Sequence, residues 1–579
     1  MSPPRLDSKP DHYGFGVLQM AKAEYTIQSL VGMVERGELR LPEMQREYVW
    51  RATRVRDLLD SLYRGYPSGV ILAWESDEIV ATTDFAIETR SSSPVRPLLL
   101  LDGQQRLTSL SAVLRGLPVS VKGRKKPVDI LFNLDHPDEL SYVTDVFEDS
   151  DEDVEPDDEQ ELDLQERFRR MTFVVSSSAL KTHKNWVNVS DVFKLPDSEI
   201  LKGSGLSGWD DPRYQRYADR LKALRAIADY QYRMDILERT KSYEEVTEIF
   251  VRVNSLGAKL RGSDLALAQI TARWRGSLEI FRDFQKEVSN LGFQFDLGIF
   301  VRTLVSLTTS QSKFAVINGI KLDQLQGGWN RTQKAFTHAL NFAKSNLDID
   351  SQTVLSSPLL LITTAYWADK LDYKISDEES KAFRRWFLTA NAKGRYSRGS
   401  SESLLDQDLA SLRDGGNAVT LSQRLTQQFG RLAFTPEDLV GRNSRSGVFK
   451  TMFLAFRDAD ARDWKTNLKI GANHAGKADA IEYHHIFPKA YLRREQPQIA
   501  IAQVDDLANL AFIGSETNKI ISDKAPSEYK KEFSKDVMER QLVDFSDGLD
   551  ASADFELFMS KRRASIAARL NEFIGSSNE

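Results

Sequence analysis

The chain has 579 residues, of which 28% are charged and 41% hydrophobic, and its net charge is −6. This apolar content is enough for several packed cores and excludes a wholly disordered protein. Cysteine is absent, which excludes disulfides, thiolate metal sites and cysteine nucleophiles. The N-terminus has no signal-peptide pattern, and no run approaches the roughly 18 apolar residues that cross a bilayer. We therefore expect a cytoplasmic protein without a membrane partner.

The negative charge is concentrated in one stretch. Residues 145–163 contain twelve acidic residues and no basic residue, and removing these twelve charges changes the net charge from −6 to +6. Such stretches are usually solvated loops. The alternative is a segment that mimics nucleic acid and covers a basic groove until substrate displaces it.

Hydrophobic periodicity predicts an α+β, multidomain chain that is predominantly helical. In chain order, the expected elements are a helix over 25–37, an extended segment over 39–50, a helix over 55–67, strands over 68–76 and 94–103, a helix over 103–116 and a strand over 128–135. The expected parts are a tail over 1–20, a front domain over 21–275, a helical region over 276–430 and a C-terminal module over 431–579.

The C-terminal module contains the motif IEYHHIFPKAYL at 481–492. We expect a strand-like run there, in which adjacent side chains point to opposite faces. His484 and His485 would then differ in role, one ligating a metal and the other facing the substrate as a base. Downstream, residues 505–526 predict a loop, a short strand and a helix that begins near Ser515. The alternative is a chance histidine pair in a structural strand.

The order His-His-Ile-x-Pro, Asn-Leu and Asn-Lys resembles the HNH (ββα-metal) endonucleases. The resemblance implies that His484 and Asn518 bind one divalent ion, Mg²⁺ or Mn²⁺, and that His485 is the general base. It also implies that Asn509 braces the loop that orients this base. The cysteines of the zinc knuckle found in many HNH proteins are missing, so packing must brace the module. The basic residues expected to hold DNA phosphates are Lys489, Arg493, Arg494, Lys519 and Lys524.

In the front domain, LLLLDGQQRLTSL (98–110) predicts a buried strand, a tight turn and a helix start. Gly103 permits close backbone approach, and the helix N-terminus offers N–H groups to an anion. Arg106 lies one turn in and is placed to reach a phosphate. Asp102 is placed to cap the helix or to hold a metal-bound water. A strand–turn–helix with Asp as its cap is the structural alternative.

Two further segments carry related motifs. LPEMQREYVW (41–50) contains Gln-Arg flanked by aromatic residues, and FVRVNSLGAKLRGSDL (250–265) contains Phe-x-Arg-x-Asn-x-x-Gly before a capped helix. Together with Asp-Gly-Gln-Gln-Arg, they resemble the N-terminal domain of the GmrSD and SspE class of restriction proteins. That domain is related to the ParB/sulfiredoxin fold, and the class pairs it with a C-terminal HNH module.

This resemblance implies a ParB/sulfiredoxin-like front domain that binds and hydrolyses a nucleoside triphosphate, GTP or ATP. It also implies defence against phage by nicking or cutting DNA according to its modification, either modified cytosine or backbone phosphorothioate. No GxxxxGK[ST] motif occurs, so the NTPase would not be a P-loop enzyme. The expected nucleotide-binding residues are Asp102, Gly103, Gln104, Gln105, Arg106, Gln45, Arg46, Arg252 and Asn254.

Two other functions stay open from the sequence. One is a ParB-like, nucleotide-dependent DNA-binding regulator, and the other is a toxin-like nuclease silenced by a partner. Assembly as a homo-oligomer is compatible with each of these functions.

Overall fold

The structure is a computed structural model that describes residues 21–42, 50–76, 82–83, 97–121, 126–138, 170–176, 180, 183–256, 262–397, 399–471 and 483–575. Contacts divide the chain into two compact units, unit 1 (residues 1–260) and unit 2 (residues 261–579). The sequence-based division instead placed boundaries after residues 275 and 430. Among the described residues, none of the helices combines the length and apolar character that crossing a membrane requires.

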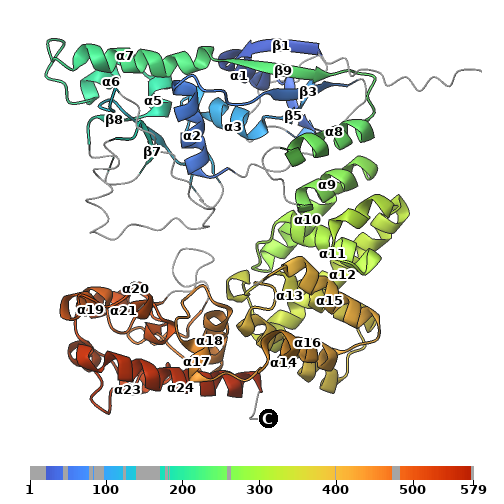
Figure 1. Cartoon of the computed structure of the whole chain (residues 1–579), viewed down its shortest axis with the longest axis vertical. Coiled ribbons are helices and arrows are strands. Elements are labelled where there is room, and N and C mark those ends of the chain that lie inside the picture. Colours follow the sequence, from blue (N-terminus) through green and yellow to red (C-terminus); the bar gives the residue numbers. More distant parts are fainter. Residues whose placement is uncertain are drawn as a thin grey trace, which may run out of the picture. The chain divides into compact units, whose positions relative to one another are not determined.

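Unit 1 is built on a mixed sheet with the strand order β1-β9-β3-β5-β2-β4, part of which Figure 1 labels. The strands are β1 (Ala21–Thr26), β2 (Leu39–Pro42), β3 (Ile71–Glu75), β4 (Thr82–Thr83), β5 (Leu98–Asp102) and β9 (Gln231–Leu237). The interior strand β3 pairs with β5 in antiparallel and with β9 in parallel orientation. The run Ile71 to Trp74 is buried throughout, as expected for a strand covered on both faces.

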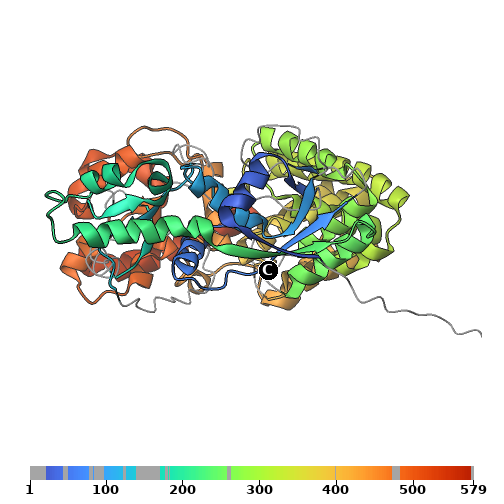
Figure 2. The ribbon, with the colours of Figure 1, turned by 90° about the horizontal axis from the view of Figure 1, so that it is seen from above.

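Several helices of unit 1 bury their apolar faces in one core with this sheet. They are α1 (Ile27–Glu35), α2 (Ala52–Tyr63), α3 (Gln104–Leu114), α5 (Val189–Lys194), α6 (Asp197–Gly203) and α7 (Tyr214–Arg225). A further helix, α8 (Tyr243–Leu256), buries Tyr243 and Val246 outside this core. A second, antiparallel sheet has the order β7-β6-β8, with β6 (Ile130–Asn133), β7 (Phe173–Val175) and β8 (Trp186–Asn188). Figures 1 and 2 show α7 leading through the short 3-10 helix Ala226–Asp229 into β9.

The elements predicted for the front domain are confirmed within a few residues at each end. The exception is the extended segment 39–50, of which β2 covers the first four residues, while 43–49 lie outside the described residues. The acidic stretch 145–163 also lies outside them.

Unit 2 is largely helical, which confirms the prediction for residues 276–430. Its longer helices are α9 (Gly262–Arg273), α10 (Ser277–Asn290), α11 (Leu297–Thr309), α12 (Leu322–Leu347), α13 (Leu359–Lys370), α14 (Asp377–Lys393), α15 (Ser401–Arg413), α16 (Ala418–Phe429), α18 (Gly447–Asp458) and α24 (Phe555–Ile574). The C-terminal α24 contacts α14, α18 and α17 (Pro436–Leu439), and Figure 1 shows it running beneath α17 and α18. One hydrophobic cluster therefore runs from Ala266 to Ile574 and joins the helical region to the C-terminal module.

A buried ion pair fixes the helices in the middle of unit 2. Arg395, just after α14, donates from Nε and Nη2 to the two carboxylate oxygens of Asp408 in α15, at 3.0 and 2.8 Å. The hydroxyl of Tyr396 donates to the same carboxylate at 2.7 Å and is also hydrogen-bonded to Thr363 in α13. Both charges are almost completely inaccessible to water, so each depends on the other.

We therefore expect Asp408→Asn, which keeps the side-chain shape and removes the charge, to leave the Arg395 guanidinium buried without a counter-charge. The free energy of unfolding of unit 2 should fall by about 3–5 kcal/mol. Scanning calorimetry of the full chain measures this change. The exposed pair of Arg413 and Asp414 supplies the control Asp414→Asn, for which we expect little change. Equal transition temperatures for the two variants would contradict this interpretation.

Candidate functional sites

The histidine pair lies in a very short strand pair. Strand β10 (His484–His485) pairs in antiparallel orientation with β11 (Leu510–Ala511), so that His484 lies opposite Ala511 and His485 opposite Leu510. The prediction of one strand-like run over 481–492 is wrong for its second half, because α19 (Lys489–Glu495) begins after Pro488. Proline fixes its own φ and suits the start of a helix, so the strand ends there.

His485 is oriented by a carboxylate that the sequence analysis missed. Its Nε2 lies 3.0 Å from Oδ1 of Asp505, and the ammonium of Lys489 lies 3.0 Å from the same oxygen. The hydrogen bond from His485 and the contacts of Lys489 lower the pKa of Asp505 to about 2, so this carboxylate is ionised and can only accept. Nε2 of His485 therefore carries the proton, and the lone pair of Nδ1 is left to accept one. The only signal in the sequence is an acidic pair just before Leu-Ala-Asn.

His484 has a different environment from its neighbour. Burial lowers the pKa of His484, the adjacent His485 lowers it further, and Asp463 acts in the opposite direction. The ring is therefore neutral at pH 7, the form that ligates metals. Asn518 lies in α21 (Ser515–Ile521) and is half-buried. Within the described part of the chain, no side-chain hydrogen bond engages the His484 ring or the Asn518 carboxamide.

Asp463 connects the surroundings of these two side chains. Its buried carboxylate accepts the N–H of Gly514 at 2.7 Å and the hydroxyl of Thr517 at 2.7 Å, which fixes the first turn of α21. The same carboxylate acts electrostatically on His484. Asp463 therefore fixes the helix turn that carries Asn518 and also acts electrostatically on His484.

Asn509 is fully buried and bonded at every polar atom of its side chain. Its Oδ1 accepts the N–H of Phe487 at 2.8 Å, and its Nδ2 donates to the carbonyls of Phe487 and Val504 at 3.1 and 3.0 Å. Its own carbonyl accepts the N–H of Ile486 at 2.7 Å. These bonds tie the residues after His485 to the segment just before Asp505, which supports the bracing role that the HNH resemblance implies.

A buried arginine from α24 holds the same segment from its other side. Arg562 donates from Nη1 to the carbonyls of Ala508 and Leu510 at 2.7 and 2.9 Å, and from Nη2 to the carbonyl of Gln541 at 2.9 Å. Complete burial lowers the pKa of Arg562 to about 9, so it still carries its charge at pH 7. The hydroxyl of Tyr529 adds a bond of 2.6 Å to the carbonyl of Ile486. Hydrogen bonds from distant helices thus brace a module that has no cysteine.

The five basic residues expected to hold DNA phosphates differ in their partners. Lys489 pairs with Asp505 beside the candidate base, and Arg494 pairs with Asp523 and Glu495. Arg493 is half-buried on α19. Lys519 on α21 and Lys524 just after it are exposed.

In unit 1, the Asp-Gly-Gln-Gln-Arg motif forms the predicted strand–turn–helix. Gly103 adopts φ 102° between β5 and α3, and a Cβ there would lie 3.3 Å from the side chain of Ile71. Of the two roles predicted for Asp102, capping the helix is wrong, because the N-cap position is occupied by Gly103, which has no side chain to accept a bond. The Asp102 carboxylate instead accepts a bond of 2.9 Å from Arg106.

Arg106 is engaged from several sides. It donates from Nη1 to the carbonyl of Ser68 at 2.6 Å and from Nη2 to the carbonyl of Val70 at 2.8 Å. Its guanidinium lies 5.7 Å from the Tyr232 ring, and a Cβ on Gly69 would lie 2.4 Å from Nη1. Arg106 therefore joins α3 to the start of β3, and a phosphate would have to take over part of this arrangement.

The remaining candidates for nucleotide binding are distributed as follows. Gln104 is buried, and Gln105 accepts the N–H of Trp50 at 3.2 Å. Arg252 on α8 is exposed and pairs with Glu248, and in the described part of the chain no hydrogen bond or ion pair joins it to the turn. Gln45, Arg46 and the side chain of Asn254 lie outside the described residues.

We expect Arg562→Met to leave the carbonyls of Ala508 and Leu510 without a donor and to loosen the β10–β11 pair. Each orphaned buried group costs about 1–3 kcal/mol. Hydrogen exchange at the amide of Ile486, which is bonded to Asn509, should therefore become faster by at least about tenfold. The neighbouring exposed residue gives the control Lys561→Met, with unchanged exchange. Equal protection in both variants would show that the arginine does not hold this segment.

Comparison with known proteins adds the following. Residues 27–271, which comprise most of unit 1 and nearly all of α9, match the family model described as "GmrSD restriction endonuclease, N-terminal domain". An uncharacterized protein of Methanocaldococcus jannaschii is 24% identical over 566 residues, which cover 89% of this chain and 88% of that protein. The family match supports a GmrSD-type restriction protein with a restriction endonuclease type of function.

Proposed function

We propose that this protein is a restriction endonuclease that hydrolyses DNA phosphodiester bonds at the β10–β11 site in unit 2. The observation that carries the proposal is the pairing of His485 with Asp505 next to His484, while the His484 ring and the Asn518 carboxamide have no hydrogen bond to the described residues. Structural histidines are normally hydrogen-bonded to the surrounding protein, whereas among the described residues neither the His484 ring nor the Asn518 carboxamide has a side-chain hydrogen bond. The family match over residues 27–271 agrees with a function on DNA.

In the proposed reaction, Nδ1 of His485 accepts a proton from the attacking water. The resulting imidazolium is stabilised by Asp505, to which Nε2–H donates. Asn509 and Arg562 hold the backbone on which this pair depends, and therefore act on catalysis through the position of His485. The nearby Lys519 and Lys524, which are exposed, are placed to bind DNA phosphates.

The donor set at this site fits a hard divalent cation. His484 supplies a neutral nitrogen and Asn518 a carboxamide oxygen, and these two side chains would hold Mg²⁺ or Mn²⁺. When bound, such an ion would stabilise the negative charge that develops on the leaving oxygen. Among the described residues no cluster of three or more His, Asp or Glu side chains forms an alternative metal site.

We further propose that the turn from Asp102 to Arg106 binds a nucleoside triphosphate, GTP or ATP, and that the bound nucleotide controls cutting. The N-terminus of α3 offers backbone N–H groups to an anion, and Arg106 supplies a charged donor. The proposal includes dependence on DNA modification, either modified cytosine or phosphorothioate, as the restriction family suggests.

The nuclease proposal is tested by plasmid nicking. We expect His485→Ala to reduce the rate by about a hundredfold or more while DNA binding is kept, because only the base is lost. EDTA should abolish the activity of the wild-type protein. His338→Ala, which removes a half-buried histidine from α12, is the matched control and should retain its rate. Nicking at the wild-type rate by His485→Ala, or nicking that resists EDTA, would refute the proposal.

Arg106→Ala separates the nucleotide role from the structural one. A lost charge-assisted bond to phosphate weakens nucleotide affinity by about tenfold to a hundredfold, measurable by titration calorimetry with GTP and ATP. Nicking by unit 2 should persist but no longer respond to nucleotide. Arg115→Ala at the other end of α3 is the control. Unchanged nucleotide affinity together with a lower melting temperature would identify Arg106 as a structural brace only.

A further inference from the structure

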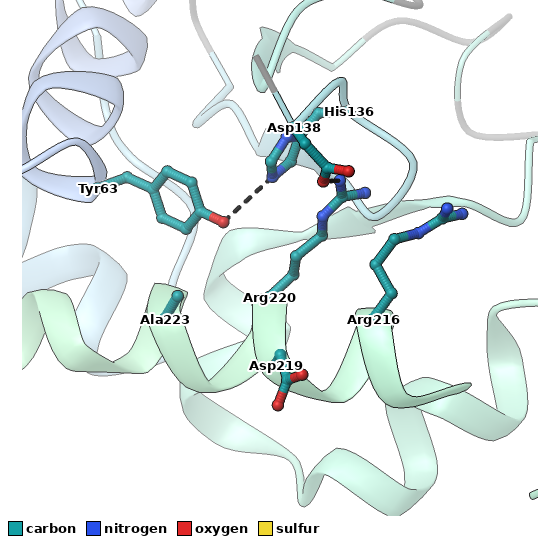
Figure 3. Close-up of a pocket in the computed structure, with 7 residues that line it drawn as sticks. All are labelled: Tyr63, His136, Asp138, Arg216, Asp219, Arg220 and Ala223. Carbon is teal, nitrogen blue, oxygen red and sulfur yellow. Dashed lines mark hydrogen bonds and ion pairs between the residues drawn. The ribbon is translucent and has the colours of Figure 1, made fainter. Parts of the chain in front are cut away.

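A hollow of about 560 Å³ lies in unit 1 between α2, α7 and the turn that follows β6. Figure 3 shows Arg216 and Arg220 pointing from α7 toward the turn that carries His136 and Asp138, with Tyr63 facing them from α2. None of the residues assigned above to the nucleotide or the nuclease site lines it. This volume lies in the range of small-molecule sites and takes one ring system, far less than a DNA duplex.

The aromatic side of the hollow is held in one protonation state. Nδ1 of His136 lies 2.8 Å from the carbonyl of Pro137, which can only accept, so Nδ1 carries the proton. Burial lowers the pKa of His136, and the ring is neutral at pH 7. Nε2 therefore accepts the hydroxyl proton of Tyr63 at 3.1 Å. The oxygen lone pairs of Tyr63 are then available only as acceptors.

The two arginines of the hollow already have carboxylate partners. Arg220 donates to the carbonyl of Leu134 and to Asp138, both at 2.6 Å, and its side chain is 8% exposed. Arg216 pairs with Asp135 at 2.5 Å and is 46% exposed. A bare phosphate would meet these carboxylates as well as the guanidinium groups, so the hollow does not favour an anion. Arg216 adds further N–H donors to the hollow, and Asp138 adds carboxylate acceptors.

A flat heterocycle with neighbouring donor and acceptor atoms fits this arrangement. Nucleobases have this pattern, because exocyclic amino groups donate to carboxylates while ring nitrogens and carbonyl oxygens accept from arginine. The rings of Tyr63 and His136 would contact such a base. A base inside a duplex cannot enter a concave site without leaving the stack.

Unit 1 also presents an exposed tryptophan, in the loop that leads into α7. Trp209, in the loop between α6 and α7, is 80% exposed. The loop is cross-linked by Asp211, which accepts the N–H groups of Ser207 and Arg213 and two bonds from the Arg213 guanidinium at 3.0 and 2.8 Å. These bonds fix the loop on both sides of Trp209, and its indole is exposed to water. Such preorganisation reduces the entropy lost on binding, and aromatic side chains stack well on bases.

The loop and the hollow adjoin along α7. The guanidinium groups of Arg213, from the loop, and Arg216, from the hollow, each lie 5.8 Å from the centre of the Tyr217 ring. The hydroxyl of Tyr217 donates to Asp135, the partner of Arg216. Tyr217 thus joins Arg213, at the end of the loop that carries Trp209, to Arg216 of the hollow.

We propose that the hollow binds a single nucleobase extruded from DNA, while Trp209 stacks on the bases that stay in the helix. This inference rests on the proposed function only in that the protein acts on DNA.

The test compares two fluorescein-labelled duplexes of the same sequence, one fully paired and one with a single bulged base. Anisotropy of the full-length protein is measured in EDTA, so that no cutting occurs. Because the bulged base is already unpaired, we expect the bulged duplex to bind at least about fivefold more tightly than the fully paired duplex. Trp209→Ala and Arg216→Ala should remove this preference, and Trp209→Phe should keep it. The control Leu117→Ala removes another exposed apolar side chain of unit 1 and should leave it unchanged.

Equal affinity for both duplexes, or a preference that survives in both alanine variants, would overturn the inference. Release of the bulged duplex by adenosine supports it, whereas release by a neutral monosaccharide alone would identify a sugar site. Plasmid nicking in Mg²⁺ distinguishes a failure of this inference from a failure of the proposed function. A protein that nicks DNA but lacks the preference refutes only the hollow, and a protein that neither binds nor nicks DNA refutes the proposed function as well.

Discussion

A strand pair of two residues on each side cannot maintain its own register, and the candidate nuclease site depends on what holds it. Buried hydrogen bonds supply this constraint. Asn509 bridges the backbone on both sides, and Arg562 reaches the two carbonyls that flank it. A buried charge is costly unless hydrogen bonds or counter-charges compensate for the lost water. The buried guanidinium of Arg562 therefore depends on its hydrogen bonds to these two carbonyls. The orientation of His485 follows from this arrangement.

This bracing also explains why the site is part of a large unit. In a small module the same loop would need a metal or disulfides, because a short chain buries too little apolar surface. Here Arg562 comes from α24, which contacts α14, α17 and α18 within one continuous hydrophobic cluster. The helices of residues 276–430 and the C-terminal module thus stabilise each other, and the site has no need of cysteine.

Unit 1 uses an arginine in a related way. Arg106 is held by the carbonyls of Ser68 and Val70 and by Asp102, so the turn is rigid without a ligand. A phosphate bound at the start of α3 would compete with these acceptors for the same guanidinium. Such an exchange would transmit occupancy of the turn to the start of β3, and the proposed nucleotide would act on unit 1 by this route.

The sequence by itself determined most elements of residues 25–135, the helical character of residues 276–430 and the strand–turn–helix at Gly103, but not strands β1, β7, β8 and β9. These features follow from local periodicity and from φ preferences, which a single segment contains. The sequence also singled out His484, His485, Asn509 and Asn518, because their spacing resembles that of a known family.

Only the tertiary structure decided which side chains meet. Asp463 and Arg562 come from segments with no motif of their own, and Asp505 lies just before the Asn-Leu motif without being part of it. Their contacts with the site arise from packing across twenty to more than fifty residues. Packing likewise directed Arg106 to backbone carbonyls and left Asp102 without a capping role. The hollow beside α7 has the same origin, since Tyr63, His136 and Arg216 come from three separate segments. Hydrogen-bond satisfaction in a buried environment is a property of the folded whole, and no local pattern encodes it.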